Sequence, residues 1–123
     1  MDLEQFRDYC LSKAGVTEEF PFGEQTFVYK VMGKMFALMD ASHFDSVNLK
    51  CEPEKAAALR EEYHSVKPGY HMNKNHWNTV EINTGIPDHL ILEWVDHSYD
   101  LVVSGLPKKL RADMPNRPGK QKP

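Results

Sequence analysis

The segment 68–80 concentrates the side chains of this sequence that could titrate, stack or meet an anion. It holds two histidines, a lysine, a tyrosine and a tryptophan, and His71 and His76 flank a turn within it. Because histidine titrates near neutral pH, the pair would form a small acid–base pocket if Asp100 or Glu81 lay beside it. The alternative is that each imidazole hydrogen-bonds to a backbone carbonyl and fixes the loop. We expect this structural role, and therefore a protein that is not an enzyme.

A second set of possible ligands lies near the end of the chain, where His89, Glu93 and His97 recur every four residues. At a rise of about 1.5 Å per helical residue the first and the last lie about 12 Å apart, so all three cannot bind one ion. Glu93 and His97 alone would bind a metal weakly, and a solvated helix face is the simpler interpretation. The sequence has no phosphate-cradling glycine loop, nucleophile elbow or zinc-binding helix motif. We therefore expect no cofactor and no metal.

These side chains must be positioned by an alternating series of helices and strands. A first helix begins after Asp2 and ends at Gly15, and a loop follows over 17–25. Two β-rich runs flank the residues 32–34, a pattern that is typical of a hairpin. The expected helices are 2–14, 53–63 and 87–103, and the expected strands are 26–31, 35–39, 46–51, 70–72 and 76–83.

The order of these elements, α-βββ-α-ββ-α, predicts an α+β fold of two layers, with helices packed on one face of an antiparallel sheet. The other face would then stay open. A tryptophan on that face would stack on bases, and neighbouring lysines would meet anions. The alternative is that the loop 67–75 covers Trp77, which then only braces the fold. Strand alternation predicts that the open face holds Lys30, Asn48, Lys50, Trp77 and Thr79.

The apolar positions give two further expectations. In the last helix, the spacing places Leu90, Trp94 and Leu101 in the core. Cys10 and Cys51 lie far apart at apolar-patterned positions, so we expect two buried, reduced thiols rather than a disulfide or a metal pair. The sequence has no long apolar run and an acidic start, which predicts a cytoplasmic protein that does not bind membranes.

Charge is divided unevenly along the chain, whose formal net charge is −3. Residues 1–104 carry −8, whereas from Gly105 onward six basic residues face Asp113 alone and give +5. A polyanion would therefore meet an acidic body with a basic end. We expect a single domain over 1–111, followed by a basic, proline-rich tail over 112–123.

Five blocks of the sequence carry a resemblance to a known family. They are GKMFA at 33–37, NLKC at 48–51, PGYHMNK at 68–74, HWNTV at 76–80 and SYDLV at 98–102. In this order, over roughly residues 1–111, they resemble the signature blocks of the MmcQ/YjbR family. The resemblance implies a fold similar to CyaY (frataxin) and to secretion chaperones. It also implies DNA binding through a double-wing motif, and no enzymatic activity.

DNA is accordingly the expected partner. Phosphate contacts would come from basic side chains, and stacking from Trp77 or Tyr70. The alternative is a protein-interaction or chaperone-like module, in which Val28, Met35 and Met39 on the open face bind a protein partner or a second copy of the chain. The residues expected to contact DNA are Lys50, Lys67, Tyr70, His71, Lys74, His76, Trp77, Lys108, Lys109 and Arg111.

Overall fold

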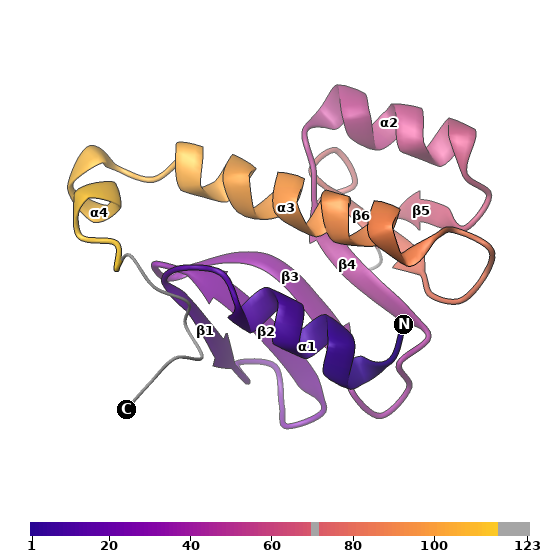
Figure 1. Cartoon of the computed structure of the whole chain (residues 1–123). Coiled ribbons are helices and arrows are strands. Elements are labelled where there is room, and N and C mark those ends of the chain that lie inside the picture. Colours follow the sequence, from indigo (N-terminus) through magenta and orange to yellow (C-terminus); the bar gives the residue numbers. More distant parts are fainter. Residues whose placement is uncertain (70–71, 116–123) are drawn as a thin grey trace.

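Six antiparallel strands form one sheet in the order β1-β2-β3-β4-β6-β5, and the helices α1, α2 and α3 lie on one side of it (Figure 1). The computed structural model describes residues 1–69 and 72–115. The strands are β1 Val16–Glu19, β2 Thr26–Val31, β3 Lys34–Asp40, β4 Ser46–Lys50, β5 Val66–Pro68 and β6 Trp77–Glu81. The helices are α1 Leu3–Leu11, α2 Pro53–Glu62, α3 Asp88–Ser104 and the short α4 Lys108–Ala112.

The predicted α+β fold is confirmed. The hairpin, the strand predicted over 46–51, which is β4, and the helices α2 and α3 are confirmed as well. Helix α1 also begins where the sequence predicts. The Asp2 carboxylate accepts a 2.8 Å hydrogen bond from the Gln5 backbone N–H, while the Gln5 side chain accepts a 2.9 Å bond from the Asp2 N–H. This reciprocal cap satisfies two backbone donors. The helix ends at Leu11, three residues before Ala14, and the left-handed φ of 75° at Gly15 turns the chain into the sheet.

An edge strand lies where the sequence predicts a loop over 17–25: residues Val16–Glu19 form β1. Its glutamates have low β propensity, but pairing with β2 overrides that preference and sets Glu18 opposite Tyr29. The Glu18 carboxylate accepts bonds of 2.7 and 3.0 Å from the Arg7 guanidinium and one of 2.9 Å from the buried Tyr29 hydroxyl. A polar network shared with α1 and β2 therefore fixes this strand.

The short strand that the sequence places at 70–72 lies earlier, at Val66–Pro68. Strand β5 pairs with β6, and the Gly69 N–H then donates a 2.8 Å bond to the Trp77 carbonyl. This bond continues the pairing for one residue beyond β5. Tyr70 and His71 lie outside the described residues.

A β-bulge in β3 adds a side chain to the core. The pairing of β2 with β3 shifts between Tyr29 and Lys30, and Phe36 is the residue that the ladder skips. Phe36 is fully buried, and its ring meets the ring of Tyr99 edge-on at a centroid distance of 5.5 Å. Its carbonyl accepts a hydrogen bond from the Ser98 hydroxyl of α3, which satisfies a backbone group in the irregular part of the ladder.

Helix α3 packs with a face that overlaps the predicted one. Ser98 is completely buried facing the bulge, and Ile91, Val95 and Val102 are buried with it. Trp94 is buried as predicted, and Leu90 is partly buried and packs against the core. The prediction for Leu101 is wrong, because its side chain is only partly buried and is not part of the packed core.

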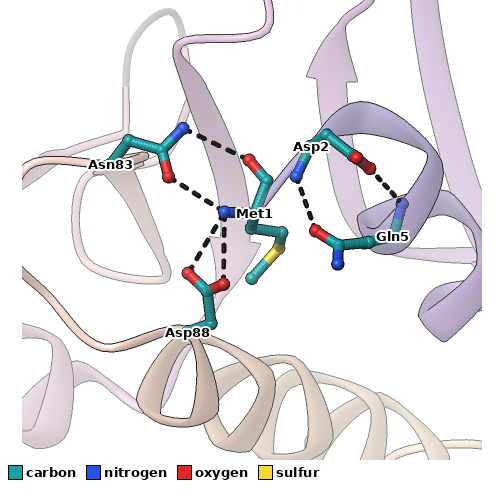
Figure 2. Close-up of polar contacts among 5 residues, drawn as sticks. All are labelled: Met1, Asp2, Gln5, Asn83 and Asp88. Atoms are coloured by element: carbon teal, nitrogen blue, oxygen red, sulfur yellow. Dashed lines mark hydrogen bonds and ion pairs between the residues drawn. The ribbon is translucent and has the colours of Figure 1, made fainter.

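The first residue is tied to the segment that joins β6 to α3 (Figure 2). The terminal ammonium of Met1 donates a 2.9 Å hydrogen bond to Asn83 Oδ1 and lies 3.1 Å from Asp88 Oδ2. Asn83 has a left-handed φ of 59°, and its amide also donates to the Met1 carbonyl at 3.2 Å. These contacts hold the start of α1 against the start of α3.

Both thiols behave as the sequence predicts, since Cys10 and Cys51 are free and buried. Burial raises the pKa of each thiol, which makes both unreactive at neutral pH. Within residues 1–69 and 72–115, no helix is both long enough and apolar enough to cross a membrane.

Candidate anion-binding site on the open sheet face

The face of the sheet away from the helices brings together the residues that strand alternation predicts. Lys50 of β4 lies directly opposite Trp77 of β6. Two residues along the same strands, and therefore on the same face, Asn48 lies opposite Thr79. The Thr79 hydroxyl donates a 2.6 Å bond to Asn48 Oδ1. The predicted placement of Lys50 and Trp77 on one face is therefore confirmed.

At one end of this face the side chains enclose a pocket of about 380 Å³, which we call the cationic pocket. Among the described residues, its charged lining consists of Lys30, Lys34 and Lys50, without a carboxylate. One ammonium is partly neutralised from outside, because Lys30 Nζ lies 3.1 Å from the Glu19 carboxylate. The described lining residues are Pro21, Phe22, Lys30, Gly33, Lys34, Met35, Lys50 and Trp77.

The hairpin between β2 and β3 places two of these lysines. Met32 and Gly33 both have left-handed φ angles, 49° and 84°, which fits a tight two-residue turn whose twist matches that of the strands. The turn is short enough for Lys34 to begin β3 beside the end of β2. Lys30 lies opposite Met35, and both are on the open face. Lys34 lies opposite the buried Val31, so it lines the pocket only from the end of the hairpin.

Trp77 forms part of the pocket wall but is only 7 % exposed. The backbone at Gly69 lies directly against it, since a Cβ built on that glycine would lie 2.7 Å from the Trp77 Cβ and 2.9 Å from its carbonyl oxygen. Most of the Trp77 surface is therefore covered, as the alternative interpretation from the sequence proposed, and little of the ring is left to contact a ligand. The exposed ring at this pocket belongs instead to Phe22, which is 62 % exposed.

The other residues expected to contact DNA are spread over the surface. Lys74 and His76 are exposed, but neither lines the cationic pocket. The Lys74 carbonyl accepts a 3.2 Å bond from Arg60, whose guanidinium also reaches Asn78 on the helix-covered face. Lys67 pairs with Glu81 at 2.8 Å. Tyr70 and His71 lie outside the described ranges.

The segment that follows the basic residues of α4 packs beside the turn between β2 and β3. A Cβ built on Gly15 would lie 3.5 Å from Pro115, 3.6 Å from the Met32 sulfur and 3.7 Å from Met114. The last described residues therefore pack beside the turn that precedes Lys34. The exposed basic residues of α4, which come just before them, are Lys108, Lys109 and Arg111.

A second, larger pocket lies toward the other end of the same face, with a volume of about 450 Å³. Its lining mixes charges: Asp40 and Asp45 stand there with Lys67 and His43. The pKa of the Asp40 carboxyl is lowered by hydrogen bonds from the hydroxyl and the backbone N–H of Ser42, so it stays ionised. Because of this mixed charge, the pocket is a weaker candidate for binding an anion.

Among the described residues, the acid–base pocket predicted from His76 with Glu81 or Asp100 is not found. Glu81 is engaged with Lys67, and Asp100 lies in α3 on the other side of the sheet. His97 accepts a 3.3 Å hydrogen bond from the Glu52 backbone N–H. Burial and the nearby Lys55 lower the pKa of His97. In the same described part of the chain, no group of three or more potential metal-ligating side chains is found, and His89 and Glu93 are exposed.

Sequence reasoning missed four residues of the pocket, Pro21, Phe22, Gly33 and Lys34. The position of Lys34 could have been predicted, because Gly33 before it marks a two-residue turn, which makes Lys34 the first residue of the second strand of the hairpin. The position of Phe22 could not, since it lies in a connecting loop, 20–25, whose path over the sheet edge depends on tertiary contacts.

Comparisons with known proteins agree with the fold and the sequence blocks. A family model described as YjbR matches residues 11–101. The protein YjbR of Escherichia coli K12 is 33 % identical over 112 residues, which are 90 % of this chain and 95 % of that protein; YbdF of Escherichia coli O157:H7 is 40 % identical over 91 residues, covering 73 % and 75 %. The crystal structure of Deinococcus radiodurans DR2400, with the domain DUF419, has a TM-score of 0.84 and 35 % identity, covering 90 % of this chain and 86 % of that one. The chain belongs to the YjbR family.

Proposed function

We propose that the protein binds nucleic acid at the cationic pocket, as an accessory factor that does not catalyse a reaction. The observation that carries the proposal is the lining of this pocket, where the charged side chains among the residues that the structure describes are Lys30, Lys34 and Lys50. Ammonium groups around a hollow beside an exposed aromatic ring suit a ligand that combines phosphates with bases.

Segregation of charge supports the proposal despite the acidic composition of the body. Many of the carboxylates lie on the helices, away from the open face, and at physiological ionic strength charges separated by more than about 8 Å are largely screened. On the open face itself, Glu81 is four residues along β6 from Trp77, which is about 13 Å in a strand. The carboxylates carried by the three helices are Glu4, Asp8, Glu54, Glu61, Glu62, Asp88, Glu93, Asp96 and Asp100.

The end of the chain would add to the positive field. Its exposed basic residues precede Pro115, which packs beside the turn leading to Lys34. The sequence continues with three more basic residues, Arg117, Lys120 and Lys122. The described lining of the pocket includes no histidine, cysteine or carboxylate to act as base or nucleophile, which supports a binding role. We place this role in the cytoplasm, where free thiols stay reduced.

The test is fluorescence anisotropy with labelled single-stranded and duplex DNA over a series of salt concentrations. The double variant Lys30→Gln/Lys50→Gln removes two ammonium groups from the open-face lining of the pocket, and Lys55→Gln/Lys74→Gln removes two exposed ones outside it. On duplex, the slope of log affinity against log salt should fall in magnitude by about 1.8 for the first variant, at about 0.9 per phosphate contact. The control should change it little. Equal effects of the two variants, or no binding at low salt, would refute the proposal.

The alternative class, a protein-interaction module, keeps one observation in its favour. Phe20 and Phe22 are the large apolar side chains that stand exposed in the described part of the chain. The apolar surface expected from the sequence is mostly not available, because Val28 and Met39 are buried and only Met35 is partly exposed. Failure of every DNA probe would make docking of a protein on these phenylalanines the better account.

A further inference from the structure

We infer that the cationic pocket holds one unpaired nucleotide and does not distinguish between bases, an inference that rests on the proposed function. The base would lie on the ring of Phe22, and the phosphates would meet the ammonium groups of Lys30 and Lys50, the two lysines that the strand register places on the open face. The protein would then prefer single strands, overhangs and gaps to intact duplex.

The first argument is the size of the pocket. Its volume of about 380 Å³ lies at the lower end of the range of about 300–1,000 Å³ for small-molecule sites, so it suits one nucleotide unit rather than a segment of duplex. A base in intact duplex would have to leave the stack to enter, which costs a few kcal/mol that an unpaired base does not pay.

The second argument is that the exposed ring is presented by an ordered loop. Phe20 packs its ring edge-on against Phe27 at 5.1 Å, and within the loop the Gly23 N–H donates to the Phe20 carbonyl at 3.3 Å. The Thr26 N–H in turn donates to the Gly23 carbonyl at 3.2 Å. Phe22 lies between these fixed points, so a base can stack on it without first ordering the loop.

The third argument concerns what the lining lacks. Discrimination between bases needs side chains that form paired hydrogen bonds with base edges, such as Arg, Asn, Gln, Asp or Glu, or Lys where the base is guanine; the lysines here are assigned to the phosphates. The described lining offers apolar contacts from Pro21, Met35 and Trp77, together with lysine ammonium groups that act as point charges. Stacking on an aromatic ring tolerates any base, because every base has a π face.

The experiment compares the full chain on three labelled probes of equal length: a single strand, a blunt duplex, and a duplex with a short single-stranded overhang. Two substitutions at one exposed position separate stacking from apolar bulk, because Phe22→Tyr keeps a ring and Phe22→Leu does not. We expect Phe22→Leu to lower affinity for the single strand and the overhang by about 5- to 150-fold, the range for loss of one base–aromatic stack. Phe22→Tyr should bind as the unmodified chain does.

Duplex binding should change little in either variant, and single strands of thymine, adenine or cytosine should bind within a few-fold of one another. Equal affinity for all three probes, with no effect of Phe22→Leu, would overturn the inference while leaving the proposed function intact. A strong preference for one base would also overturn it. Absence of binding to any probe at low salt would refute the proposed function and the inference together.

Discussion

Replacing Gly69 by alanine tests whether the backbone seals one side of Trp77. The added methyl group would lie 2.7 Å from the Trp77 Cβ and 2.9 Å from the Trp77 carbonyl oxygen, and neither atom can move without displacing β6. Gly69 is not among the residues with a left-handed φ, so the cost is one of space and not of backbone strain. Overpacking of this kind typically costs about 1–3 kcal/mol.

The expected change in melting temperature follows from the length of the chain. At about 2.1 cal/mol/K per residue, 123 residues have an unfolding entropy of about 0.26 kcal/mol/K, so Gly69→Ala should lower Tm by about 4–12 °C. Gly105→Ala is the matched control, because its new Cβ would meet no atom closer than 3.6 Å. Calorimetry or circular dichroism measures both. A Tm for Gly69→Ala within a degree of the unmodified chain would mean that the segment after β5 does not close over Trp77.

Three further outcomes are expected. Trp94→Ala should lower the free energy of unfolding by about 3–5 kcal/mol in chemical denaturation, because this buried ring packs against Tyr63 at 5.3 Å; an unchanged value would contradict its place in the core. The pKa of His97 is lowered in the folded chain, so the unfolded chain binds a proton at this imidazole more readily. The free energy of unfolding should therefore fall as the pH drops through about 6.5. In thermal melts from about pH 7.5 to 5, His97→Gln should reduce this dependence of stability on pH. Deleting 116–123, which removes Arg117, Lys120 and Lys122, should weaken binding to all DNA sequences alike and flatten the salt dependence. Cutting before Leu106 would be a poor test, because that side chain is buried.

The elements that the sequence predicts best are those whose signals are local. The hairpin, the Asp2 cap and the period of two in β4 and β6 depend on neighbouring residues, and together they place Lys50 beside Trp77. Strand β1 is not predicted, because it is stabilised by pairing with β2 and by the ion pair of Glu18 with Arg7. Neither contact leaves a pattern within the residues of β1 themselves. Such tertiary effects override local propensity.

The site is only partly predictable for the same reason. Alternation assigns a residue to a face, but it does not reveal that Gly69 covers Trp77 or that Phe22 reaches the pocket. The face of α3 is also only partly predictable, since Leu101 fits the helical period as well as the residues that are buried. Tertiary packing decides the face: Ile91, Trp94, Val95 and Val102 are buried against the sheet, together with Ser98, whose hydroxyl donates to the Phe36 carbonyl.

The bulge in β3 also has a consequence for insertions and deletions. Lys30 lies opposite Met35 and Tyr29 opposite Ala37, so removing Phe36 would leave a regular ladder in which every other residue keeps its face. The extra residue thus supplies one aromatic side chain to the core without altering the surface that lines the cationic pocket. Inserting or deleting a residue at position 36 can therefore change the packing of α3 against the sheet while the lysines on the open face keep their places. Most substitutions within a strand would lack this selectivity.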